Sequence, residues 1–166
     1  MTDKPYPIEK MTEQDVEAAV DLITRAMNPT EATWARKTMA YHFQCRSNGI
    51  DDGRTYLVCR SDDTIFGLVG LHHYLWGPEQ NVWLSWFAVE PNFQRQGHGR
   101  ALLKAVESIA LDHGYRKLLV ETYAHMNFAN ARAFYVSQDF SEVGRISNYL
   151  DDGSDMLVYG KELKAP

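Results

Sequence analysis

Apolar residues near the N-terminus recur at intervals of three and four positions, as on one face of an α-helix. A capping pair of Thr12 and Asp15 predicts the start of this helix, and Asn28-Pro29 predicts its end. A second helix is expected from about residue 30 to 46, before Asn48-Gly49. Ahead of both helices, Pro7 and Ile8 are expected to open a short strand.

The spacing then changes to that of β-strands. Two runs rich in β-branched and aromatic residues, 55–60 and 64–74, are joined by Ser61-Asp62-Asp63 and predict a hairpin. A third run, Val82–Val89, follows a break at Gly77-Pro78. We therefore expect three consecutive strands in the middle of the chain.

The C-terminal half alternates helices and strands. A loop with two glycines leads into an amphipathic helix that Gly114 ends, and its apolar face is expected to contain Leu102, Leu103, Val106, Ile109 and Ala110. A strand at Lys117–Tyr123, a helix around 127–138 and a hairpin of the runs 142–150 and 156–163 follow. The order β-α-α-β-β-β-α-β-α-β-β predicts a mixed α/β fold, and the lack of repeats and linkers predicts one domain over residues 1–166.

The composition argues against several classes of function. The 166 residues are 45% hydrophobic, which is enough for one substantial core. There are 17 basic and 22 acidic residues, and the net charge of −5 argues against nucleic acid as a partner, because binding phosphates needs a basic surface. The sequence has no signal-peptide pattern and no apolar run long enough to span a bilayer, so we expect a cytoplasmic protein with no membrane partner.

The cysteines and histidines do not predict a metal site. Cys45 and Cys59 cannot form a disulfide framework and are expected as reduced thiols in the core. His72 and His73 are adjacent on an expected strand, so their side chains point to opposite faces and cannot hold one ion. His42 shares a helix face with Cys45, but no second pair has matching spacing. We therefore expect no metal.

The most informative segment is the loop between the third strand and the amphipathic helix. Its residues are Arg95, Gln96, Gly97, His98, Gly99 and Arg100. Such a loop can direct several backbone N–H groups to one point, at a helix N-terminus whose dipole favours anions. Glycine permits positive φ and leaves room for a phosphate oxygen. The Walker and dinucleotide patterns both fail here, because Arg100 follows the second glycine and Leu102 stands where a third glycine is needed.

The pattern Gln94-x-x-Gly97-x-Gly99, after a strand that ends in Val89-x-Pro91, resembles the acetyl-CoA motif of the GNAT N-acetyltransferase superfamily. The run 87–103 is especially similar to the ribosomal-protein alanine N-acetyltransferase branch. Phe134-Tyr135, followed by Phe140, resembles the second motif of the family. The resemblance implies a mostly antiparallel sheet of about seven strands flanked by about four helices. It also implies that the strands 82–89 and 117–123 are parallel and splay apart.

The resemblance assigns residues to acetyl-CoA, the implied co-substrate. The backbone of Phe87, Ala88 and Val89 is expected to pair with the pantetheine amides, as a further strand would. The loop 95–100 is expected to bind the pyrophosphate. Asn127 or Asn130 is expected to supply the contact made by an asparagine of the second motif, since Phe128 stands at the family's usual position.

The resemblance also suggests catalytic residues. Tyr135 matches the general acid that protonates the departing thiolate, and Glu121 stands near the position of a glutamate that accepts the proton of the amine. His125 and an ordered water are alternatives to Glu121 as the base. The function implied is acetyl transfer to a primary amine of a small molecule or peptide. A non-catalytic acyl-CoA sensor is the alternative.

The acceptor and the oligomeric state are not defined by the sequence. The acidic balance permits a cationic or neutral substrate. Aromatic residues are expected mainly in the core, with Trp34 or Tyr41 lining the acceptor pocket. The acidic turn 151–155 is expected as a solvated hairpin loop, with attraction of a cationic amine as the alternative. A monomer and a homodimer both stay open.

Overall fold

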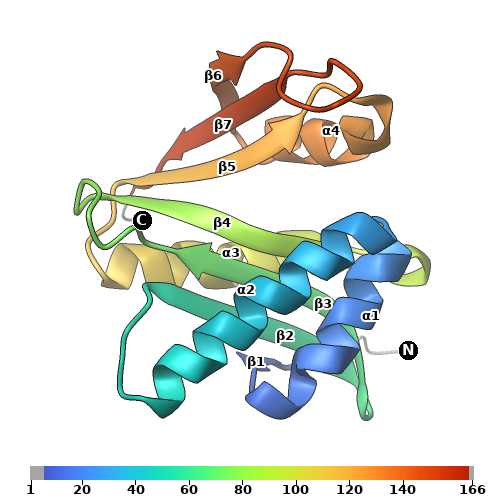
Figure 1. Cartoon of the computed structure of the whole chain (residues 1–166), viewed down its shortest axis with the longest axis vertical. Helices are drawn as coiled ribbons and strands as arrows, with labels where there is room; N and C mark the ends of the chain where they lie inside the picture. The colour runs from blue at the N-terminus through green and yellow to red at the C-terminus, as the bar shows by residue number, and fades with distance from the viewer. Residues whose placement is uncertain (1–5, 165–166) are drawn as a thin grey trace.

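The computed structural model describes residues 6–164 and contains one seven-stranded sheet with helices on both faces (Figure 1). The strands lie in the order β1-β2-β3-β4-β5-β7-β6, and every neighbouring pair is antiparallel except β4 with β5. This confirms the expected fold class. The strand bounds are β1 Ile8–Lys10, β2 Arg54–Ser61, β3 Thr64–His72, β4 Asn81–Val89, β5 Lys117–Tyr123, β6 Ser141–Ile146 and β7 Met156–Glu162.

Two helices cover each face of the sheet. The helices α1 (Val16–Ala26) and α2 (Pro29–Ser47) share one apolar cluster, and α3 (His98–Asp112) and α4 (Ala129–Ser137) belong to the other. Successive side chains of β2 point to opposite faces of the sheet and so contribute to both clusters. Tyr56 packs in the cluster of α1 and α2, and Leu57 packs in the cluster of α3. Cys45 and Cys59 are buried free thiols, as expected. No helix within residues 6–164 is long and apolar enough to cross a membrane.

Local signals predicted most element ends. The carboxylate of Asp15 accepts the backbone N–H of Thr12 at 2.8 Å, which confirms the capping pair, although a short 3₁₀ turn (Glu13–Asp15) precedes α1. Asn28 caps α2 by accepting the N–H of Glu31 at 2.9 Å. The expected strand 142–150 was too long, since β6 ends at Ile146. The chain then forms an irregular loop, in which Asp155 accepts the N–H of Asn148 at 2.9 Å.

The strands β4 and β5 separate along their length (Figure 1). Only Asn81–Trp83 pairs with Lys117–Leu119, so the carboxyl-terminal halves of both strands have no strand between them. A bulge in β4 lies beside this opening, because the pairing of β3 with β4 shifts register between Leu68 and Gly70. Trp86, in the bulge, has a φ of +34°. The splay expected from the sequence is therefore present.

Candidate active-site cleft

A cleft of about 310 Å³ opens where β4 and β5 separate. It lies between the two helical layers, so side chains from both faces of the sheet reach it. Its lining comes from α1 and α2 (Met27, Glu31, Thr38), from β2 and the end of β3 (Arg54, His72, Tyr74), from β4 (Trp83 to Phe87), from β5 (Val120 to Tyr123) and from the α4 region (Phe128, Ala131, Tyr135).

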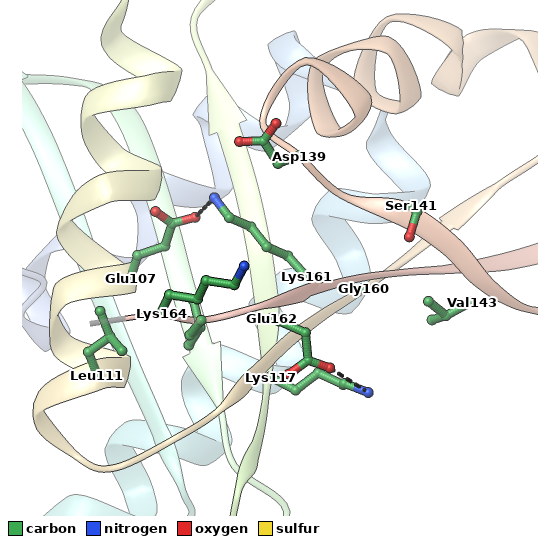
Figure 2. A pocket seen from close by; sticks show the side chains of 11 residues that line it. Glu107, Leu111, Lys117, Asp139, Ser141, Val143, Gly160, Lys161, Glu162 and Lys164 are labelled. Carbon is green, nitrogen blue, oxygen red and sulfur yellow. Dashed lines mark hydrogen bonds and ion pairs between the residues drawn. The ribbon is translucent and has the colours of Figure 1, made fainter. Parts of the chain in front are cut away.

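A larger cavity, of about 570 Å³, lies away from the splay, between α3, β6 and β7 (Figure 2). Four of its charged side chains form two ion pairs. Lys161 Nζ lies 2.6 Å from Glu107 Oε1, and Lys117 Nζ lies 3.1 Å from Glu162 Oε1 (Figure 2). It holds none of the residues expected to bind acetyl-CoA or to carry the reaction. Although this cavity is larger, the cleft between β4 and β5 is therefore the stronger candidate for the active site.

The glycine loop presents unpaired backbone donors. The backbone N–H groups of residues 95–100 have no hydrogen-bond acceptor among residues 6–164. Gly97 precedes the first helical residue with a φ of +90°, and a Cβ there would meet nothing within 4 Å. The side chain of Gln94 holds the loop by donating to Val89 O at 2.9 Å, and that of Gln96 by donating to Asn92 O at 2.8 Å. This geometry suits an anionic group at the helix N-terminus.

Gly99 and His98 do not have the roles that a flexible phosphate-binding loop would suggest. Gly99 lies inside the first turn of α3, and a Cβ there would be 3.4 Å from the ring of Phe134. Its absent side chain therefore permits close packing rather than a left-handed turn. The ring of His98 packs on Phe66, with centroids 5.0 Å apart, so His98 presents its backbone to the loop. The side chains of Arg95 and Arg100 are exposed.

The β4 backbone beside the opening alternates in direction. The N–H of Glu90 donates to Phe66 O at 2.8 Å, toward β3. By alternation, the amide of Val89 faces the open side and that of Ala88 faces β3. Of the three expected backbone contacts, Ala88 is thus directed away from the opening. The ring of Phe87 contacts Phe134 edge to face, with centroids 5.5 Å apart.

Tyr135 lies on α4 and lines the cleft. It is 6% exposed, and its ring packs beside Phe134, Phe140 and Tyr159, with centroids 5.8, 5.6 and 6.3 Å away. Burial raises the pKa of its phenol well above 10. The hydroxyl is therefore protonated at neutral pH and is able to donate.

Two carboxylates line the cleft, Glu121 from β5 and Glu31 from α2. Burial raises the pKa of both side chains, and neither has an ion-pair partner among residues 6–164. Tyr123 lines the cleft with them, and burial and the charges of Glu31 and Glu121 raise its pKa to about 12. Glu121, the residue expected as the base, thus lines the same cleft as Tyr135. Sequence reasoning missed Glu31. The sequence shows only that it is an acidic residue in the first turn of a helix, where acidic residues are common because they interact favourably with the helix dipole.

His125 does not line the cleft. Its Nδ1 accepts the backbone N–H of Asn127 at 3.1 Å, and its Nε2 lies 3.6 Å from Asp152 Oδ2. These contacts occupy both ring nitrogens, which argues against His125 as the base. Asn127 and Asn130 are exposed on the turn before α4 and on its first turn, and they do not line the cleft either.

The expectation for the aromatic residues was wrong in three cases. Trp34 is 53% exposed, Tyr41 is 57% exposed and Trp76 is 86% exposed, and none of them lines the cleft. Trp83 and Trp86 form its aromatic wall instead, together with Tyr74 and Tyr123. Helical spacing alone did not show that the outer face of α2 carries large aromatic side chains into solvent.

His72 and Arg54 also line the cleft. Burial and the Arg54 guanidinium lower the pKa of His72 to about 4, so this imidazole is neutral at pH 7. Arg54 Nη1 donates to Asp52 Oδ2 at 3.1 Å, and Asp52 Oδ1 lies 2.8 Å from His42 Nδ1. The charge of Arg54 is thereby compensated. No group of three or more His, Cys, Asp or Glu side chains in residues 6–164 could hold a metal ion.

Comparison with known proteins agrees with this geometry. Residues 18–140 match the family model described as "Acetyltransferase (GNAT) family". Among solved structures, a putative GNAT acetyltransferase from Desulfovibrio desulfuricans superposes with a TM-score of 0.85 at 24% identity, covering 96% of this chain and all (100%) of that one. The ribosomal-protein-S18-alanine N-acetyltransferase of Escherichia coli gives 0.75 at 25% identity, covering 98% and 96%.

One curated relative is the aminoglycoside N(6')-acetyltransferase type 1 of Stenotrophomonas maltophilia. The two proteins are 30% identical over 100 residues, which is 57% of this chain. The match spans 64% of that relative, so this chain covers less than two thirds of its length.

Proposed function

This chain belongs to the acetyltransferase (GNAT) family, and on that premise we propose that it transfers the acetyl group of acetyl-CoA to a primary amine by direct attack. One observation carries the proposal. The cleft, which is lined by both a buried tyrosine and a carboxylate, lies beside residues 83–87 of β4. The unpaired backbone amides of residues 95–100 follow the carboxyl end of the same strand. An anionic, extended acyl carrier and an amine would meet in that cleft.

The described residues fit acetyl-CoA. The open space at Gly97 and the free amides of 95–100 suit a pyrophosphate, and the exposed guanidinium groups of Arg95 and Arg100 add charge. Val89 and Phe87 offer backbone groups to the pantetheine arm, and Asn127 or Asn130 is proposed to contact CoA from the start of α4. The thioester itself supplies an activated acetyl group.

In the proposed reaction, the amine first loses a proton to Glu121, directly or through water, because an ammonium has no lone pair with which to attack. The nitrogen then forms a bond to the acetyl carbon as the C–S bond breaks. Tyr135 donates a proton to the departing sulfur, and its raised pKa keeps it protonated until that moment. The nitrogen loses its second proton as the C–S bond breaks, and this proton returns through water to the phenolate of Tyr135. The proton on Glu121 goes to solvent, so the ammonium and acetyl-CoA give the amide, CoA thiol and one proton. The reaction uses no metal.

Release of CoA thiol in the presence of a panel of primary amines tests this function. We expect thiol release that depends on the amine and yields an N-acetylated product. Binding of acetyl-CoA without turnover for any amine would instead support the sensor alternative. A single domain over residues 1–166 and a cytoplasmic location are further parts of the proposal.

A further inference from the structure

We propose that the acceptor carries two cationic nitrogens, and that Glu31 binds the nitrogen that does not react. This inference rests on the proposed function and adds the class of acceptor to it. Glu121 serves the reacting nitrogen from β5, whereas Glu31 lines the same cleft from α2. The acceptors favoured are therefore diamines and polyamino compounds over simple monoamines.

The first argument is that Glu31 has no cationic partner among residues 6–164, whereas two other glutamates pair with arginines of α1 and α2. Glu17 pairs with Arg36, and Glu90 pairs with Arg25 at 2.7 Å. Glu31 is fixed by its backbone, through the Asn28 cap, and its carboxylate has no such partner among residues 6–164. A carboxylate withdrawn from water costs free energy unless a positive charge compensates it.

The second argument is the charge balance of the cleft. Glu31 and Glu121 are both uncompensated, and both act on Tyr123. Arg54 lines the same cleft, but its charge is compensated by Asp52, since Arg54 Nη1 lies 3.1 Å from Asp52 Oδ2. Two negative charges therefore face the ligand, and one ammonium leaves one of them without a partner.

The third argument does not involve carboxylates. Thr122 lines the cleft and is 3% exposed, and its Oγ1 is buried with no hydrogen-bond partner among residues 6–164. Buried hydroxyls are almost always paired, so an unpaired one at a cleft indicates a ligand that supplies a donor or an acceptor. The aromatic wall of the cleft, which includes Tyr74, Trp83 and Trp86, suits the alkyl portion of such a ligand and its cationic nitrogens.

The two carboxylates would then have different tasks. Glu121 must accept a proton from the nitrogen that attacks the thioester, so this nitrogen becomes neutral. Glu31 must stay ionised and hold a nitrogen that remains charged throughout. An acceptor with both nitrogens would be oriented at two points, which lowers the cost of reaching the reactive geometry.

The test compares matched amines with wild type and Glu31→Gln. The acceptors are putrescine and cadaverine, with butylamine and pentylamine as the monoamines of equal chain length. We expect kcat/KM of wild type to be at least about 10-fold higher for the diamines, because a charge-assisted contact is added. In Glu31→Gln this preference should largely disappear, through a fall in kcat/KM for the diamines, while the affinity for acetyl-CoA is unchanged.

Glu13→Gln is the matched control. Glu13 lies in the 3₁₀ turn that precedes α1 and does not line the cleft, so the same loss of charge there should leave the preference intact. Equal kcat/KM for diamines and monoamines in wild type, or an unchanged preference in Glu31→Gln, would overturn the proposal while leaving acetyl transfer in place.

Binding of tetramethylputrescine separates this proposal from the proposed function. Its tertiary amines cannot form an amide, so calorimetry measures binding without reaction. We expect binding to wild type and at least about 10-fold weaker binding to Glu31→Gln. If no amine is acetylated but this difference is found, the dication site stands and the function fails. If wild type does not bind the compound, the dication site is wrong whether or not amines are acetylated.

Discussion

The indole Nε1 of Trp86 donates a hydrogen bond of 2.6 Å to Oγ1 of Thr38. Trp86 is the bulge residue of β4 with positive φ, and Thr38 lies on α2, where its hydroxyl donates in turn to Ala35 O at 3.0 Å. This bond ties the strained backbone at the cleft to the helix that covers it. A non-glycine residue at positive φ persists only where its surroundings hold it.

Removing this bond should destabilise the protein modestly. Thr38→Val keeps the shape of the side chain but leaves the indole N–H without its acceptor. We expect a loss of about 1 kcal/mol, or roughly 2–4 °C in Tm, measured by thermal unfolding. Thr38→Ser retains the hydroxyl and should behave like wild type. Equal Tm values for the valine and serine variants would show that the bond contributes nothing.

Acetyl-CoA binding should depend on Gly97. At about 100 times its Kd, acetyl-CoA is expected to stabilise the wild type by about 2.7 kcal/mol, which raises Tm by roughly 5–10 °C. Gly97→Val should abolish this shift, because its side chain would fill the space open to a phosphate. The positive φ of 90° also means that the variant itself melts at a lower temperature.

Gly114→Val controls for that backbone strain. Gly114 has a φ of +81° and open space within 4 Å, but it follows α3 at the end remote from the loop. This variant should lose a similar amount of stability and keep the full acetyl-CoA shift. If both variants keep the shift, the loop 95–100 does not bind the co-substrate.

Tyr135→Phe should lower kcat with little change in acetyl-CoA affinity. The contact of the hydroxyl with the sulfur strengthens in the transition state, so its loss affects turnover rather than binding. We expect a decrease of about 100-fold, at the lower end for a general acid, because a thiolate leaves readily. Steady-state kinetics with an active amine measures it. Tyr159→Phe, a buried neighbour outside the cleft, should retain activity.

Turnover should rise with pH through the ionisation of Glu121. Burial raises the pKa of this carboxyl above 4.5, and only the ionised form accepts the proton of the amine. Glu121→Gln should lower kcat and remove this limb from a pH profile of kcat. An unchanged profile would assign the base to water instead.

Glu121→Gln, which should lower kcat, should raise the thermal stability of the protein. Because the pKa of Glu121 is raised in the folded state, that state binds the proton more tightly than the unfolded chain. The stabilisation is present below the unfolded pKa and is lost as pH rises through the folded pKa. Glutamine is neutral throughout, so Glu121→Gln should gain Tm relative to wild type between about pH 4 and pH 7. Thermal unfolding at both pH values measures the difference.

Several features of this protein followed from local sequence. The change from helical to strand spacing predicted the element order, and Asn28-Pro29 marked the boundary between α1 and α2. These signals are local because helix caps and side-chain periodicity depend on residues a few positions apart. Tyr135 and the loop 95–100 were identified through their family motifs, which are also short.

Other features needed contacts between distant parts of the chain. Spacing within the loop did not show that a side chain at Gly99 would meet Phe134 on another helix. The exposure of Trp34 depends on which face of α2 meets the sheet. Spacing along one helix identifies a face, and only packing determines which face is buried.

The element order, the glycine loop 95–100 and the place of Tyr135 on α4 could thus be read from short segments of sequence. Folding in three dimensions was needed to show that β5 leaves β4 after three paired positions, and that Glu31 and Glu121 line one cleft with no ion-pair partner among residues 6–164. The physical reason is that charge compensation is a property of neighbours in space. Whether a carboxylate is paired depends on side chains brought from other elements, and residue spacing does not specify them.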